Sequence, residues 1–105
     1  MNAIHAERLA RQLHLVRSGD PDLTQRQLAM LMVAAWTEGD HTVRSMAAWL
    51  GVQKPVITRA ANRLSELGFI RRDRDPNDGR NIFLRATDSG RAFVERFGRE
   101  GGSVQ

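Results

Sequence analysis

A single glycine, Gly51, stands between two segments of helical pattern, and this limits the possible folds more than any other feature of the sequence. Apolar residues recur at helical spacing over residues 43–50, and the same periodicity resumes three residues later at Lys54. Pro55 is compatible with the first turn of the second helix, because amides there have no intrahelical partner. Glycine stops a helix and permits a tight turn. The pattern therefore predicts a short helix, a tight turn and a longer helix over residues 54–67.

Size and composition favour one domain in a reducing compartment. The chain has 105 residues, which fits a single domain, and it has no cysteine, which excludes disulfides and thiol sensing. The longest apolar run, from Leu28 to Trp36, is too short to span a bilayer. Glu7 and Arg8 precede any hydrophobic run, so the N-terminus does not resemble a secretory signal. We expect a cytoplasmic protein with one domain over residues 1–100 and no membrane partner.

Further helices and a hairpin flank this central pair. Thr24 and Gln27 form a capping-box pattern at the start of a helix, and Thr87 is suited to cap the last helix. A loop over residues 75–80, rich in turn formers, joins two segments of strand character. The other expected elements are a first helix over residues 3–17, strands over 69–74 and 81–86, a last helix over 87–100 and a flexible tail over 101–105.

The helix over residues 54–67 is expected to have one apolar and one polar side, because its residues follow one another at about 100° around the axis. The inward side consists of Val56, Ala60, Leu64 and Leu67. The outward side consists of Lys54, Pro55, Thr58 and Asn62, with Arg59 on the flank. Elsewhere, Trp36 is expected to anchor the core. Trp49 is expected to be partly buried, with a contact to a partner protein as the alternative.

The positive charge of the chain is concentrated in one stretch. The net charge is +4, and residues 54–85 carry eight basic and four acidic side chains, whereas the segments on either side are balanced. A local excess of basic residues is the electrostatic footprint of a polyanion partner. The charge pattern therefore indicates a polyanion as the partner of this stretch.

The order of the elements, with a basic hairpin after the helix-turn-helix, corresponds to a winged helix-turn-helix. Residues 42–93 resemble the core of the MarR family of bacterial transcription regulators. The resemblance is carried by the segment over residues 43–64, by LGFIRR at 67–72, by DPNDGR at 75–80 and by TDSG at 87–90. The sequence departs from the family pattern at Met46 and Ala86, where leucine is usual, at Gln53, where a serine cap is usual, and at Gly79, where many members have arginine.

The resemblance implies a mainly α (α+β) fold of about five helices, with the helix-turn-helix over residues 43–67 and a two- or three-stranded β wing over 69–86. It also implies a transcriptional regulator that binds double-stranded DNA sequence-specifically, without enzymatic activity or a cofactor. The helix over 54–67 would lie in the major groove and the wing residues 72–80 on the backbone or in the minor groove. The expected DNA-contacting residues are Gln53, Lys54, Pro55, Thr58, Arg59, Asn62, Arg63, Arg72, Arg74, Asn77 and Arg80.

Two of these residues have side chains suited to particular bases. Asn62 is suited to adenine and Arg59 to guanine. Asp75 and Asp78 are expected to stabilise the turn of the wing and to orient one of its arginines.

The resemblance also implies an assembly. Terminal helices of two subunits interlock in the family, and small ligands often bind beside them. We therefore expect a homodimer through the helices over residues 1–22 and 87–100. The expected contact residues are Leu9, Leu13, Val16, Phe93 and Phe97. Most members continue for another long helix or two beyond the position of Phe97, and this chain stops, so we expect no small-molecule effector.

Several alternatives stay open on the sequence alone. The polar side of the helix over 54–67 could be an ordinary solvated face, and the hairpin arginines could protect a sheet edge against aggregation. Arg63 lies nearer the buried side and could be an internal ion-pair partner. The main alternative function is a winged-helix module for protein contacts. A third is recognition of RNA, or of DNA shape without base selection.

Catalysis and metal binding have no support in the sequence. Residues 73–84 superficially resemble a calcium loop, but Asp78 and Leu84 stand where the loop requires glycine and glutamate. The three histidines lack partners at ligand spacing, and no serine has a nearby His–Asp pattern. We therefore expect neither an enzyme nor a metal protein.

Overall fold

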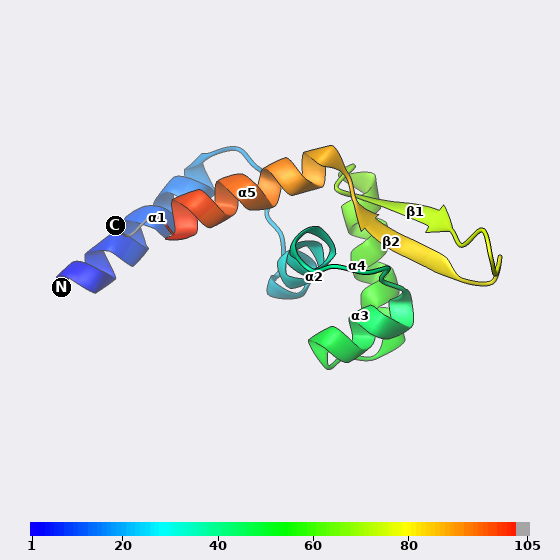
Figure 1. The fold of residues 1–105 in the computed structure, drawn as a ribbon. Coiled ribbons are helices and arrows are strands. Elements are labelled where there is room, and N and C mark those ends of the chain that lie inside the picture. Colours follow the sequence, from blue (N-terminus) through cyan, green and yellow to red (C-terminus); the bar gives the residue numbers. More distant parts are fainter. Residues whose placement is uncertain (103–105) are drawn as a thin grey trace.

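The computed structural model describes the backbone of residues 1–102 and the side chains of residues 1–96. Within this range, five helices and one two-stranded antiparallel sheet form a winged helix-turn-helix (Figure 1). The mainly α fold with a two-stranded wing confirms the expected fold class. The elements are α1 (Ala3–Arg17), α2 (Gln25–Trp36), α3 (Val43–Leu50), α4 (Lys54–Glu66), β1 (Ile70–Arg74), β2 (Ile82–Ala86) and α5 (Asp88–Gly102).

Each element for which the sequence predicts both bounds begins and ends within two residues of them, and α2 begins directly after the expected cap at Thr24. The largest difference is at the end of α5, which continues to Gly102. The first two residues of the expected tail are therefore helical. Residues 103–105 lie outside the described residues.

Side-chain caps begin α2 and α3. The Oγ1 atom of Thr24 accepts a hydrogen bond from the backbone N–H of Gln27, and the Gln27 side chain accepts one from the N–H of Thr24, at 3.1 and 2.9 Å. Thr42 and Ser45 form the same reciprocal pair at the start of α3. Each cap satisfies two backbone donors that a helix start otherwise leaves without a partner.

The helix-turn-helix depends on Gly51, which adopts a left-handed conformation with φ at +67°. Its N–H and that of Val52 both donate to the carbonyl of Ala47, which closes the end of α3. Helix α4 then begins without a side-chain cap at Gln53, as the departure from the family pattern predicts. Pro55 in the first turn is compatible with the helical backbone there.

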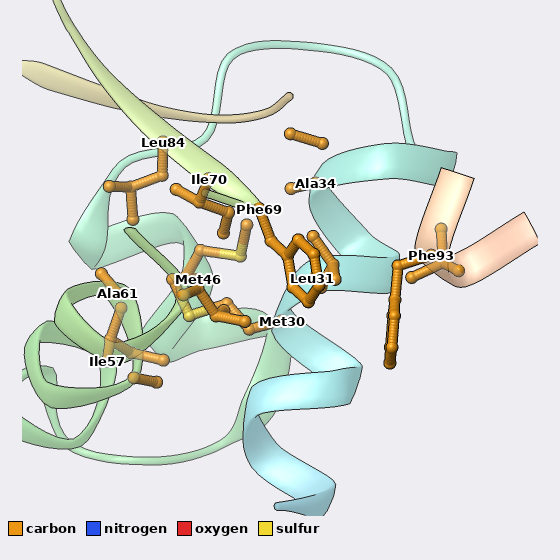
Figure 2. Packing of buried hydrophobic residues seen from close by; sticks show 14 residues of the cluster. Met30, Leu31, Ala34, Met46, Ile57, Ala61, Phe69, Ile70, Leu84 and Phe93 are labelled. Carbon is orange, nitrogen blue, oxygen red and sulfur yellow. The ribbon is translucent and has the colours of Figure 1, made fainter. Parts of the chain in front are cut away.

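The core gathers where α2, α3, α4 and the wing meet (Figure 2). Met30 and Leu31 enter it from α2, Met46 from α3, Ile57 and Leu64 from α4, Ile70 and Leu84 from the wing, and Val94 from α5. Each of these side chains is at least 98% buried. Burial of a side chain of this size stabilises a fold by about 1.5–3 kcal/mol. These contacts hold α4 in place.

The buried side of α4 is rotated slightly about the helix axis from the side that the sequence predicts. The buried residues of the helix are Ile57, Ala60, Ala61 and Leu64. Val56 and Leu67, which were expected to be buried, are only half-buried. The difference arises because α4 packs against both α2 and α3, which centres its buried stripe on Ile57, Ala61 and Leu64 and leaves Val56 and Leu67 at the edge.

The expectation that Trp36 anchors the core is wrong. Its side chain is 52% exposed, because it lies roughly half a turn around α2 from the buried stripe of Met30, Leu31 and Ala34. Trp49 was expected to be partly buried and is 59% exposed. Its ring and the buried His41 ring pack in a T-shaped arrangement, with the centroids 6.3 Å apart.

The wing is attached to the core along both of its strands. Antiparallel pairing runs from Ile70 opposite Ala86 to Arg74 opposite Ile82. The backbone N–H of Leu84 donates to the carbonyl of His41 at 2.7 Å, which joins β2 to the loop before α3. The wing therefore cannot move far relative to α3 and α4 without breaking buried contacts.

Helix α5 approaches the backbone at the start of the wing very closely. The Thr87 hydroxyl donates to the carbonyl of Gly68 at 2.6 Å and accepts from the N–H of Gly90. A Cβ atom at Gly90 would lie 2.2 Å from the backbone oxygen of Phe69, so only glycine permits this packing. The Phe69 and Phe93 rings pack beside this contact, with centroids 4.8 Å apart.

Helices α1 and α5 lie side by side and extend away from the winged part (Figure 1). The radius of gyration of the Cα atoms is 15.4 Å, against about 13 Å for a compact chain of this length. Helix α1 has no buried residue, and neither it nor any other described helix is long and apolar enough to cross a membrane. The elongation leaves most of the large apolar side chains of α1 exposed, namely Ile4, Leu9, Leu13 and Val16.

Replacement of Gly90 by alanine is expected to destabilise the fold, because a backbone carbonyl cannot move aside as a side chain can. We expect Gly90→Ala to lower the free energy of unfolding by about 1–3 kcal/mol in urea denaturation. Gly79→Ala is the matched control, since a Cβ there meets only the Arg74 side chain at 3.6 Å. Equal stability of the two variants would contradict the close approach of α5.

Candidate nucleic-acid interface

The outward side of α4 carries the side chains expected to contact DNA. Because Ile57, Ala61 and Leu64 face the core, the opposite side of the helix faces solvent. The expected residues on and before this helix are all exposed: Gln53, Lys54, Pro55, Thr58, Arg59, Asn62 and Arg63. The Thr58 hydroxyl donates to the carbonyl of Lys54 at 3.3 Å and retains its capacity to accept. Helix α4 therefore presents a polar ridge that contains three cations.

Arg63 is part of this exposed ridge. The sequence left open an internal ion pair for this residue, but Arg63 is exposed and makes no ion pair with another described residue. Its guanidinium is available to an external anion. Arg59, which was expected on the flank, lies near the centre of the outward side, because it is nearly opposite the buried stripe.

Hydrogen bonds hold the tip of the wing in one shape. The Arg74 guanidinium donates to the carbonyl of Gly79 at 2.7 Å, across the loop. The carboxylate of Asp75 accepts from the N–H of Asn77, and that of Asp78 accepts from the N–H of Arg80. Asp78 also pairs with the Arg80 guanidinium at 3.3 Å. The expectation that the two aspartates stabilise the turn and orient a wing arginine is confirmed.

The wing arginines differ in how far their guanidinium groups are available to an external partner. Arg74 supports the loop through Gly79, whereas the Arg80 side chain is 92% exposed at the tip. Asn77 is exposed beside it. The Arg80 guanidinium therefore extends into solvent at the tip, whereas Arg74 contributes charge from within the loop.

Arg72 connects the wing to α4. Its Nη2 atom donates to Oδ1 of Asn62 at 2.5 Å, and its Nη1 atom donates to Oγ of Ser65 at 3.1 Å. The ridge of α4 and the wing therefore form one continuous surface. Neither acceptor could be assigned to Arg72 from sequence, because the pairing depends on how the hairpin folds back beside α4.

Two further arginines of the basic stretch are neutralised within the chain. Arg71 and Arg85 lie opposite one another in the sheet, where like charges repel. The Asp73 carboxylate bridges them, at 2.9 and 3.0 Å, and Asp40 pairs with Arg85 at 2.7 Å. The positive charge without an internal ion pair is consequently concentrated on α4, because Arg80 at the wing tip also pairs with Asp78.

The expected dimer residues fall into three groups. Leu9, Leu13 and Val16 are exposed on α1, at 47, 37 and 72%. Phe93 is only 6% exposed and belongs to the core of its own chain, so it has little area to offer a partner. The side chain of Phe97 lies outside the described residues.

A cleft lies between α1, α2 and α5. Its volume is about 430 Å³, and its lining includes Leu15, Val16, Leu23, Leu28 and Phe93 together with the polar residues of the loop after α1. The expectation that the chain has no small-molecule effector stays a prediction. Among the described residues, no group of three or more His, Cys, Asp or Glu side chains could hold a metal ion.

The sequence is similar to a known family and to proteins named as transcriptional regulators. The profile of the MarR family matches residues 23–82. An uncharacterised HTH-type transcriptional regulator of Mycobacterium leprae is 34% identical over 88 residues, which cover 84% of this chain and 60% of the relative. The chain thus spans about 60% of the length of this relative.

Solved structures agree with the fold. A transcriptional regulator from Thermotoga maritima superposes with a TM-score of 0.74 at 25% identity, over 96% of this chain and 69% of the other. The MepR protein of Staphylococcus aureus, solved in complex with DNA, superposes with a TM-score of 0.81 at 22% identity, over 95% of this chain and 80% of the other. Because the family profile covers more than half of the sequence, including the whole helix-turn-helix and most of the wing, the chain belongs to the MarR family.

Proposed function

We propose that this protein is a transcriptional regulator that binds double-stranded DNA sequence-specifically, with residues 54–63 in the major groove and wing residues 72–80 on the adjacent backbone or minor groove. In this proposal the protein binds DNA in the bacterial cytoplasm and catalyses no reaction. The observation that carries it is the exposed polar ridge of α4, which the buried contacts of Ile57 and Leu64 hold outward. A major groove about 12 Å wide admits one helix presented in this way.

The charge distribution supports the same proposal. Internal ion pairs neutralise Arg71 and Arg85, whereas Lys54, Arg59 and Arg63 form no such pair with another described residue. Cations near phosphates release condensed counterions, which makes binding fall steeply with salt. The relatives support it too, since several are named transcriptional regulators and MepR was solved with DNA.

A homodimer is part of the proposal. Leu9, Leu13 and Val16 recur on one side of α1 and are exposed, on a helix with no buried residue. A second copy of α1 would cover this apolar side. Dimeric helix-turn-helix proteins bind two half-sites of a palindromic operator, and promoter occlusion would be the simplest outcome.

A module for protein contacts is the second candidate, and the exposed tryptophans favour it. Trp36 and Trp49 are each more than half exposed, and tryptophan is enriched where proteins bind one another. Neither residue belongs to the ridge of α4, so a protein contact there would be compatible with DNA binding. A monomer without affinity for any genomic fragment would favour this candidate over the first.

Replacement of Arg59 should relax sequence preference, whereas replacement of Arg80 should weaken binding to all sequences alike. Arg59 is placed to meet a base edge, and its loss should cost about 1–3 kcal/mol on the selected duplex and less on a scrambled one. Loss of a phosphate contact by Arg80→Ala should also reduce the log–log salt slope by about 0.9. Fluorescence anisotropy with duplexes selected from a random pool measures both effects.

Arg8→Ala is the matched control for these two variants, because it removes the same charge from an exposed position on α1. It should leave both affinity and sequence preference nearly unchanged. If Arg59→Ala and Arg80→Ala bind every duplex as the unaltered protein does, the proposed interface is wrong.

Leu13→Glu should convert the dimer into a monomer, because it places a charge in the apolar side of α1. Size-exclusion chromatography with light scattering gives the mass directly. Ile4→Glu is the control: Ile4 is 61% exposed and lies on the opposite side of the same helix, so the dimer should persist. A monomeric mass for the unaltered protein at micromolar concentration would refute the proposed dimer.

A further inference from the structure

The contact between Arg72 and α4 fixes the orientation of a side chain in the middle of the proposed interface. The guanidinium of Arg72 donates to Asn62 through Nη2 and to Ser65 through Nη1. The two acceptors are three residues apart and therefore adjacent on the helix surface. The planar guanidinium has donors in a fixed fork, which suits two adjacent acceptors.

This pairing leaves the Asn62 amide only one favourable orientation. An amide has a carbonyl oxygen that accepts and an NH₂ group that donates, whereas a guanidinium has donors alone. If the amide were reversed, its N–H groups would face the N–H groups of Arg72. The oxygen must therefore point to Arg72 and the NH₂ group away from it.

The NH₂ group of Asn62 is available to a ligand. Asn62 is exposed, and its Nδ2 atom forms no hydrogen bond with another described residue. The Ser65 hydroxyl holds the second arm of the guanidinium, so Arg72 cannot turn toward a phosphate without losing two hydrogen bonds. The exposed group at this point of the ridge is thus a donor that is fixed in direction.

A fixed donor selects different bases from a free asparagine amide. Free asparagine recognises adenine by accepting from the N6 amino group while it donates to N7. The oxygen of Asn62 has a second lone pair, but it is turned toward the Arg72 guanidinium that already donates to it, so the group that the amide turns away from Arg72 is the NH₂ donor. Guanine presents two acceptors in the major groove, O6 and N7, and offers no donor there.

We propose that Arg72 is a positioning residue that holds the Asn62 amide as a hydrogen-bond donor, so that Asn62 selects guanine rather than adenine at the base pair it meets. The inference rests on the proposed DNA binding of α4. It replaces the expectation from sequence that Asn62 recognises adenine, and it gives Arg72 a positioning role at the start of the wing segment that is proposed to lie on the DNA.

The first test exchanges the donor for an acceptor while the link to Arg72 is kept. Asn62→Asp has nearly the same shape and still pairs with Arg72, now as an ion pair, but it cannot donate. Selection from random duplexes should give a guanine preference at one position for the unaltered protein. Asn62→Asp should lose that preference in favour of cytosine, whose N4 group donates, and bind the original duplex on the order of tenfold more weakly.

The second test releases the amide. Arg72→Gln supplies a carbonyl as well as an NH₂ group, so Asn62 can turn over, and the preference at that position should shift from guanine toward adenine. Arg72→Lys keeps a donor without an acceptor and should retain guanine. Arg71→Gln is the control, because it removes the same charge from the neighbouring residue, which pairs with Asp73 instead. A purely structural role of Arg72 would not change one base preference alone.

A DNA-free measurement separates this inference from the proposed function. The side-chain ¹⁵NH₂ group of Asn62 should relax as a rigid group in the unaltered protein and as a mobile one in Arg72→Gln. Equal mobility in both proteins overturns the inference, as does adenine at the Asn62 position or an unchanged profile in Arg72→Gln. If the Asn62 amide is rigid but the protein selects no duplex, the proposed function has failed. Base selection by Asn62, which rests on that function, then fails too.

Discussion

The burial of one side of α4 is the constraint on which the rest of the structure depends. Ile57 and Leu64 are fully buried against residues from α2, α3 and the wing, so α4 cannot rotate about its axis without exposing them. The same contacts turn Arg59 and Asn62 toward solvent. Apolar burial contributes free energy to the fold and, through the helical period, also decides which polar groups can meet a partner.

The wing continues this surface because polar contacts fix both of its strands relative to α3 and α4. The carbonyl of His41 accepts from β2, Asp73 and Asp40 neutralise the two arginines on the paired strands, and Arg72 reaches α4. Ion pairs between exposed side chains contribute little stability individually. Their effect here is on the distribution of charge, since Arg71 and Arg85 are paired with aspartates, whereas the cations of α4 have no ion-pair partner among the described residues.

The order and bounds of the elements could be predicted from the sequence because their signals are local. Thr24, Thr42 and Gly51 act within three or four residues of themselves, through caps and a left-handed turn. Side-chain environments that depend on neighbouring elements were harder to predict. The sequence does not reveal that α2 turns Trp36 outward, that α4 is covered from two sides, or that Phe93 packs on Phe69 within its own chain.

The candidate site likewise has some features that the sequence predicts and others that only the structure shows. The exposed residues of α4 follow from its period and from the position of the glycine turn, and the turn-stabilising role of Asp75 and Asp78 follows from their local chemistry. The partners of Arg72 and Arg74 required coordinates, because each depends on how the hairpin folds beside α4 or across its own loop. Asn62 is named by the sequence, whereas the direction of its amide is fixed only in the structure.

The claim that the outward side of α4 binds DNA can be tested most directly by amide hydrogen exchange. Exchange is measured with and without a duplex that the protein has selected. The account predicts slower exchange on binding at residues 53–63 and 72–80, with no change around Trp36 and Trp49. Slower exchange confined to the surface around the two tryptophans, with α4 and the wing unaffected, would contradict it.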